Sequence, residues 1–289
     1  LTKVIIANNI YMNKGYELKA DFVSKANDYY NAQPETRDFA DGKTRDVINQ
    51  WGSRQTQKMI PEVLAANEFD ITAVGYLLNA TYFKGEWQLK FDKNSTKNEP
   101  FTLEGGKGET TVPMMHQEEN FSIAAGSNCQ LLSMPYGNGA YAMTIVLPNE
   151  GKTISEVLQT LTAEQWSTYQ QQMTHGVNVD VKLPRFETST STSLVDAMKQ
   201  LGVNKAFTDK AEFDNFCNVP THISFMKQAA RIKVNEDGAE AAAVTAIGMS
   251  VTSVGPTQPA VFHATRPFLY VISEMSTGTI FFIGKYMGE

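Results

Sequence analysis

The sequence predicts an α+β fold, in which large mixed or antiparallel β-sheets pack against helices, from three observations. Residues 71–83 form a long and almost continuously apolar segment, as expected for a central strand covered on both faces. Residues 110–148 contain several strand patterns separated by turn residues, and strand patterns return after residue 260. Helical spacing occupies residues 154–173 and 193–201 between these two groups. No internal repeat or low-complexity linker divides the chain, so we expect one domain over residues 1–289.

The remaining elements follow from local patterns. In the first third of the chain we expect a strand, a helix, a short strand and a second helix, at residues 3–12, 15–30, 35–39 and 42–57. Gly137, Asn138 and Gly139 precede an apolar run at residues 141–147, which indicates a hairpin. Gly202 stands where a helix ends. The last strands are rich in β-branched and aromatic residues, at 260–264, 268–273 and 279–287.

Composition excludes several classes of function. The chain is 42% hydrophobic and carries a net charge of −6, which favours a globular protein and disfavours a phosphate-binding surface. No basic cluster with interleaved aromatics is present, so nucleic acid is not expected as a partner. No apolar run approaches the length of a membrane span.

The residue types that carry catalysis do not form a recognisable motif. The four histidines occur singly, without a His-Glu-x-x-His pair, and no Gly-x-Ser-x-Gly elbow is present. Cys129 and Cys217 lack the paired spacing of a zinc or redox site, and we expect core thiols, with a disulfide as the alternative. We therefore expect no enzyme activity, no catalytic residues, no metal and no cofactor.

Residues 235–246 (NEDGAEAAAVTA) carry small side chains in a pattern that a β-sheet can accept. Counting by two after Gly238 divides them between two faces of a strand. Ala239, Ala241, Ala243 and Thr245 fall on one face, and Glu240, Ala242, Val244 and Ala246 fall on the other. The pattern predicts a hinge that is a loop in one state and a strand in another, with an ordinary helix rich in Ala and Glu as the alternative.

Residues 78–87 (LNATYFKGEW) resemble a long and distinctive block of the serpin family. The hinge is similar to that family's Glu-Glu/Asp-Gly-Thr-Glu-Ala-Ala-Ala pattern, with Ala239 in place of the usual Thr. Further matches follow in the family's order, at residues 112–115, 134–136, 145–148, 183–186, 201–207 and 266–268. The resemblance spans the whole chain and implies a serpin fold with a long reactive-centre loop.

The resemblance also implies how the protein acts. A target protease cuts the reactive-centre loop, residues 237–258, and is trapped as a covalent acyl-enzyme when the hinge, residues 236–246, inserts into the central sheet as a strand. Counting the family's usual spacing from Glu236 puts the cut between Thr252 and Ser253. Because this count can shift by several residues, the cut can also fall at Met249, Ser250 or Val251.

Other residues match family positions that control opening of the sheet. Trp87 is expected near the end of the sheet where the loop begins. Arg185 is expected to pair with Glu236 at the base of the hinge. Asn79 matches a residue that normally meets a histidine, and Gln228 stands at that histidine's position, so the network that holds the sheet closed is altered.

The loop's composition indicates the target. No Lys or Arg lies between Lys233 and Arg266, which disfavours trypsin-like proteases. Small and apolar residues favour elastase-like or subtilisin-like proteases, with a papain-like protease as an alternative. We expect a monomer, with a loop–sheet polymer as the alternative state.

Two expectations concern the whole protein. The resemblance implies about a hundred residues of helices ahead of the first strand, where they cover the sheet. This sequence does not contain them, and we expect that they are deleted, cleaved off or part of a longer chain. The family resemblance favours a secreted, periplasmic or cell-envelope location, although no targeting signal is visible in this sequence. The alternative function is that of a non-inhibitory serpin, acting as a binding protein or chaperone.

Overall fold

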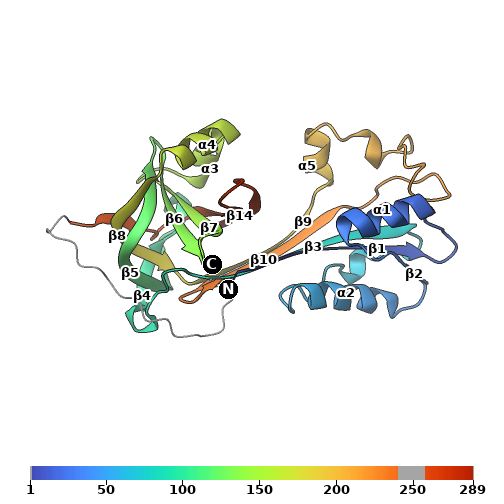
Figure 1. The fold of residues 1–289 in the computed structure, drawn as a ribbon, viewed down its shortest axis with the longest axis horizontal. Helices are drawn as coiled ribbons and strands as arrows, with labels where there is room; N and C mark the ends of the chain where they lie inside the picture. Colours follow the sequence, from blue (N-terminus) through green and yellow to red (C-terminus); the bar gives the residue numbers. More distant parts are fainter. Residues whose placement is uncertain (1, 240–257, 289) are drawn as a thin grey trace. The chain divides into compact units, whose positions relative to one another are not determined.

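The computed structural model describes residues 2–239 and 258–288 (Figure 1). The α-helices are α1 (Ala20–Tyr30), α2 (Thr44–Gln55), α3 (Ile154–Thr160), α4 (Ala163–Gln171) and α5 (Val195–Gln200). The strands are β1 (Lys3–Asn13), β2 (Glu35–Arg37), β3 (Gly75–Glu86), β4 (Lys97–Thr102), β5 (Glu109–Ala125), β6 (Cys129–Tyr136), β7 (Tyr141–Pro148), β8 (Thr174–Pro184), β9 (Phe186–Ser193), β10 (Lys227–Asn235), β11 (Gly238–Ala239), β12 (Ala260–His263), β13 (Phe268–Glu274) and β14 (Ile280–Tyr286). Single-turn 3-10 helices lie at Ala66–Glu68, Lys93–Ser95, Glu104–Gly106 and Lys205–Phe207.

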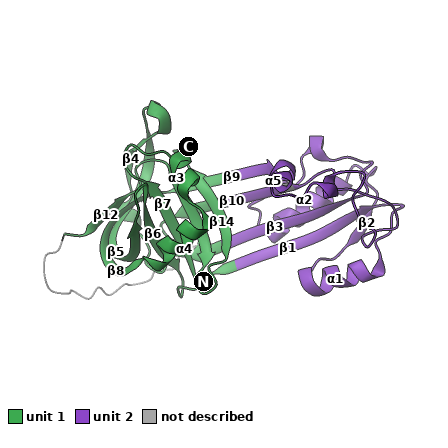
Figure 2. Cartoon of the chain, turned by 90° about the horizontal axis from the view of Figure 1, so that it is seen from above, with its two compact units in different colours: residues 1–3, 84–188, 232–289 green, residues 4–83, 189–231 purple. Residues whose placement is uncertain are grey.

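Two sheets organise these strands. One has six strands in the order β2-β1-β3-β11-β10-β9, and the other runs β12-β8-β5-β6-β7-β13-β14, with β4 paired to β5. The chain groups into two compact units (Figure 2). Unit 1 contains Leu1–Lys3, Lys84–Thr188 and Ile232–Glu289, and unit 2 contains Val4–Phe83 and Ser189–Arg231. The predicted α+β class is confirmed by this mixture of sheets and helices, while the single domain over residues 1–289 stays a prediction.

Unit 2 buries both faces of the second half of β1. Tyr11 lies in a core cluster with Ile48 and Trp51 of α2 and with Tyr76 of β3. Its neighbours Ile10 and Met12 point to the opposite face and join a second cluster with residues from α1. Successive side chains of a strand alternate between faces, so one strand serves two cores.

The segment that follows α2 is fixed to that helix by buried polar side chains. Asn49, 9% exposed, accepts hydrogen bonds at 2.9 Å from the backbone N–H groups of Val63 and Leu64 and donates to the Leu64 carbonyl at 3.0 Å. Thr56 is fully buried, donates to the Gly52 carbonyl and accepts from the Ile60 N–H at 3.0 Å. Because buried backbone groups need partners, these contacts give the segment a defined path.

Unit 1 contains the long antiparallel sheet. The predicted hairpin is confirmed, since β6 and β7 pair in antiparallel register from Cys129 opposite Pro148 to Tyr136 opposite Tyr141. Helices α3 and α4 pack on this sheet through a cluster that includes Leu131, Val146 and Val157. The helix α3 begins with a capping box, in which Thr153 and Glu156 satisfy each other's backbone N–H groups.

Three differences from the sequence expectations have a clear local cause. The first helix begins at Ala20 instead of residue 15, because Gly15 has a φ of 97° and starts a turn. The helical spacing at 154–173 forms two helices, since Thr162 caps the start of α4. The central strand begins at Gly75, four residues after the predicted start, because Asp70 makes a turn by accepting from the Thr72 N–H.

The burial of β3 also differs from the expectation. Tyr76 and Ala80 are buried in the core of unit 2. On the other face, Leu77 is 63% exposed and Asn79 is exposed. The described residues therefore cover only one face of the first part of β3. The prediction of a strand covered on both faces was therefore wrong for this part of the described structure. The two cysteines were predicted correctly, since Cys129 and Cys217 are buried free thiols.

Candidate functional site at the start of the loop

The chain turns back after β10 and begins a new strand. Strand β11 pairs antiparallel with β10, with Ala239 opposite Val234 and Gly238 opposite Asn235. It also pairs antiparallel with β3, with Gly238 opposite Glu86. The Asn235 side chain holds the turn by accepting from the N–H groups of Asp237 at 3.0 Å and Gly238 at 3.2 Å. The first residues of the hinge therefore already lie between two strands.

Glycine is required at residue 238. Its φ is 141°, in a region that L side chains rarely adopt. A Cβ at this position would lie 2.0 Å from the Gly85 carbonyl oxygen and 2.7 Å from the Glu86 Cα. The obstructing atoms are backbone, which cannot move without breaking the pairing of β3 with β11.

Glu236 is a buried acid with two side-chain partners. Its carboxylate, 3% exposed, accepts from the Arg185 guanidinium at 2.5 Å and from the Thr96 hydroxyl at 2.6 Å. Burial raises the pKa of Glu236, but the hydrogen bonds from Arg185 and Thr96 outweigh it, and the pKa lies below its ordinary value. The structure thus brings Arg185 and Glu236 together as the resemblance implied, and adds Thr96, which sequence reasoning did not identify.

Asp237 forms a second set of ionic contacts that sequence reasoning also missed. It is 9% exposed, and its carboxylate lies 2.7 Å from the Lys93 ammonium and 4.0 Å from that of Lys90. Lys90 also pairs with Glu86 at 2.8 Å. The signal in the sequence was the position of two lysines shortly after Trp87, but nothing in their spacing identified Asp237 as the partner.

Trp87 packs directly against the turn. It is 2% exposed, its ring stacks on that of Tyr136 with centroids 4.4 Å apart, and its indole N–H donates to the Asn235 carbonyl at 2.9 Å. Its backbone N–H donates to the Asp237 carbonyl, also at 2.9 Å. Buried indoles need such a partner, and here the partner is the turn itself.

Asn79 and Gln228 share no hydrogen bond among the described residues. The Asn79 amide donates to the Asn8 side chain at 2.9 Å and its oxygen accepts from Thr81 at 3.1 Å. Gln228 lies exposed on β10. The direct hydrogen bond that the resemblance would place between these two positions is therefore not present among the described residues.

The rest of the predicted site lies outside the described residues. This holds for the hinge residues Glu240, Ala241, Ala242, Ala243 and Thr245, and for the candidate cut sites Met249, Ser250, Val251, Thr252 and Ser253. Within residues 2–239 and 258–288, no group of three or more His, Cys, Asp or Glu side chains is placed to hold a metal ion. No described helix is both long enough and apolar enough to cross a membrane.

A family model described as Serpin (serine protease inhibitor) matches residues 2–288. The chain therefore belongs to the serpin family, whose members are mostly inhibitors rather than catalysts. The predicted family and its fold are confirmed.

Named relatives and solved structures show the same family likeness. The chain is 33% identical to the leukocyte elastase inhibitor of Homo sapiens, over 97% of this chain and 76% of the relative. The crystal structure of a thermophilic serpin, tengpin, in the native state matches with a TM-score of 0.89 and 29% identity, over 99% of this chain and 73% of that one. A complex of thyroxine-binding globulin with thyroxine shares the fold, with a TM-score of 0.87 and 24% identity, over 99% and 76% of the two chains. The chain spans 66% of the length of an uncharacterized serpin-like protein of Methanosarcina mazei and 76% of the length of the human leukocyte elastase inhibitor.

Proposed function

We propose that the full-length protein inhibits proteases as a suicide substrate, in which the cut loop inserts into the six-stranded sheet and traps the acyl-enzyme. The observation that carries this proposal is the position of β11. Gly238 and Ala239 already pair with both β3 and β10, so a strand that continues from Ala239 extends an existing three-strand arrangement.

The side chains at this position agree with insertion. Ala239 is fully buried, and the period of a strand puts Ala241, Ala243 and Thr245 on the same face. These residues are small enough to be buried between neighbouring strands. About a dozen new ladder hydrogen bonds, at ~1 kcal/mol each, give on the order of 10 kcal/mol, which is available to distort the bound protease.

The composition of residues 240–257 supports the choice of target. These residues include no Lys or Arg, so a protease that requires a cation in its first pocket finds none. We therefore propose elastase-like or subtilisin-like proteases as the targets, with papain-like enzymes as a further class. A location outside the cytoplasm or in the cell envelope is part of the proposal and rests on the family resemblance.

The test is incubation of the full-length protein with elastase-like, subtilisin-like, papain-like and trypsin-like proteases, followed by denaturing gels and mass spectrometry. We expect a complex that survives denaturation and a cut between residues 249 and 253. The Ala241→Arg variant, with a large cation on the buried face, is expected to be cut without forming the complex. Its matched control, Ala242→Arg, changes the opposite face and is expected to keep trapping the protease.

The opposite result is also informative. Cleavage without a complex, for every protease tested and with the full-length protein, would contradict inhibition. It would leave a non-inhibitory serpin that binds a ligand or a partner protein.

A further inference from the structure

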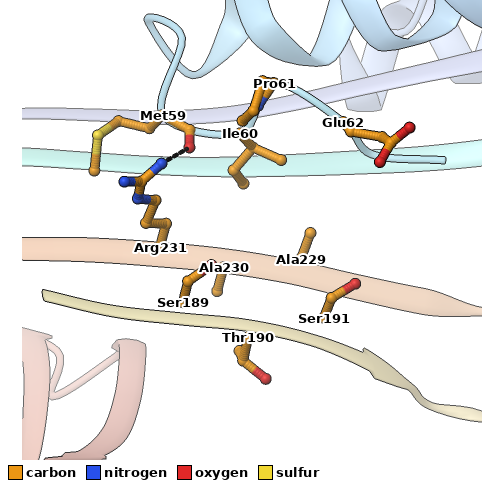
Figure 3. A pocket seen from close by; sticks show the side chains of 10 residues that line it. All are labelled: Met59, Ile60, Pro61, Glu62, Ser189, Thr190, Ser191, Ala229, Ala230 and Arg231. Carbon is orange, nitrogen blue, oxygen red and sulfur yellow. Dashed lines mark hydrogen bonds between the residues drawn. The ribbon is translucent and has the colours of Figure 1, made fainter. Parts of the chain in front are cut away.

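Arg231 on β10 makes a contact that neither the sequence motifs nor the family assignment explains. Its guanidinium donates to the Met59 carbonyl at 3.2 Å, and Figure 3 shows the side chain extending from the strand to the segment that follows α2. The contact borders a cavity of about 210 Å³, which is lined by residues 59–62, 189–191 and 229–231. Arg231 thus connects strand β10 to a loop from a distant part of the sequence.

That segment is buried mainly against strands β1 and β3 rather than β10. Ile60 and Leu64 are buried in the same core as Tyr11 of β1 and Tyr76 of β3, and Ala229 of β10 packs against this core while remaining partly buried. Asn49 and Thr56 of the α2 region bind the backbone of the same segment. The segment that carries the Met59 carbonyl is therefore held mainly by β1, α2 and β3.

Insertion of the loop requires β3 and β10 to separate. The strand order places β11 between them, and neighbouring strands lie about 4.8 Å apart, so each added stretch of β11 keeps β3 and β10 about 10 Å apart. Met59 is held with β3, whereas Arg231 is carried by β10. A hydrogen bond across this line must break or change partners when the two strands part.

The position normally used to hold the sheet closed offers no such bond here. Asn79 bonds to Asn8 and Thr81, and it shares no hydrogen bond with Gln228 in the described structure. Residue 231 lies three positions further along the same strand. The long side chain of Arg231 reaches the Met59 carbonyl on the segment after α2.

We propose that the Arg231–Met59 contact is a clasp that keeps β3 and β10 together and sets the rate at which the loop strand inserts. This inference rests on the proposed function, because it assigns the control of the same insertion. A net hydrogen bond of ordinary strength corresponds to a change of about three- to tenfold in the rate of opening.

The experiment uses a synthetic peptide with the sequence of residues 239–250, which competes with the protein's own loop for the space between β3 and β10. Its incorporation into the uncleaved full-length protein is followed by mobility on native gels. We expect Arg231→Met, which keeps the apolar stem and removes every donor, to take up the peptide about three- to tenfold faster than the unmodified protein. Arg231→Lys, which keeps one donor group, should give an intermediate rate.

Two controls separate a clasp from a general loss of stability. Lys233→Met removes a cation from the same strand, and the Lys233 ammonium pairs with Glu187 at 3.9 Å rather than with the segment after α2. Ala26→Gly in α1 lowers the stability of unit 2 without touching Met59. Both should leave the uptake rate within about twofold of the unmodified protein.

The outcomes distinguish this inference from the proposed function. Equal uptake by Arg231→Met and Lys233→Met, with both proteins folded by circular dichroism, would overturn the clasp. Faster uptake by Arg231→Met alone supports it even if no protease is trapped, because peptide uptake requires no protease. Failure of the covalent complex in the unmodified protein would instead overturn the proposed inhibition.

Discussion

The turn after β10 and the middle of β10 differ in how firmly they are held. At the turn, Glu236, Asp237 and Gly238 are all buried. Arg185 and Thr96 bind Glu236, and Lys93 binds Asp237. In the middle of the strand, Gln228 is exposed, and the Arg231 guanidinium donates to the Met59 carbonyl. The comparison indicates that the inserted strand starts from a firmly held turn, whereas the exposed Gln228 contributes little to holding the strand below it. Substitutions at the turn should therefore cost far more stability than substitutions around Gln228.

The largest effect is expected at Gly238. The change Gly238→Ala puts a Cβ against the Gly85 carbonyl and forces a left-handed φ on an L side chain, which should cost about 3 kcal/mol. Differential scanning calorimetry of the uncleaved protein measures this as a lowered melting temperature. Gly42→Ala is the control, since a Cβ there meets nothing within 4 Å. Equal effects of the two changes would show that the turn is not the constrained region.

The ion pair should give the next largest effect, and the two partners should not be equivalent. Arg185→Met leaves the buried Glu236 carboxylate without its cation and should cost about 2–3 kcal/mol. Glu236→Gln leaves Arg185, which is 45% exposed and can be solvated, and should cost about 1 kcal/mol. Urea unfolding of the two variants measures the difference. A larger loss for Glu236→Gln than for Arg185→Met would contradict the burial argument.

The pH dependence of stability should show a smaller effect with a defined sign. The pKa of Glu236 in the folded protein lies below its ordinary value of 4.5. The ionised carboxylate therefore contributes stability above that value, and the contribution is lost as the pH falls through the folded pKa. Melting temperatures of the unmodified protein and Glu236→Gln should converge as the pH is lowered from about 6 to about 3. A gap that stays constant over this range would show that the carboxylate charge does not matter.

The smallest effect is expected at Gln228. Because Gln228 is exposed and shares no hydrogen bond with Asn79 in the described structure, Gln228→Ala should change the free energy of unfolding by less than about 0.5 kcal/mol. Chemical unfolding measures it, with Gly238→Ala as the contrasting variant. A loss above about 1 kcal/mol would show that the middle of β10 is held as firmly as the turn.

The sequence predicted the fold well where its signals were local or matched a long motif. The hairpin of β6 and β7 followed from the glycines at 137 and 139, and the family followed from the block at residues 78–87. It did less well at boundaries, because Thr162 and Asp70 redirect the chain through single side-chain hydrogen bonds that periodicity does not reveal.

The candidate site was predictable in part for a related reason. Arg185 and Glu236 were paired through the family's pattern, whereas Thr96, Lys93 and Arg231 were not identified. Their partners lie far along the chain: Thr96 is 140 residues from Glu236, and Arg231 is 172 residues from the Met59 carbonyl. Contacts over such separations depend on the finished fold, and a contact to a backbone carbonyl leaves no residue type in the sequence to mark it.

The central claim is that the loop joins the sheet as a strand that continues from Ala239. Its most direct test is the melting temperature of the full-length protein before and after a single cut between residues 249 and 253. About a dozen new backbone hydrogen bonds predict a rise of more than about 20 °C on cutting. An unchanged or lower melting temperature in the cut protein would contradict the insertion of the loop.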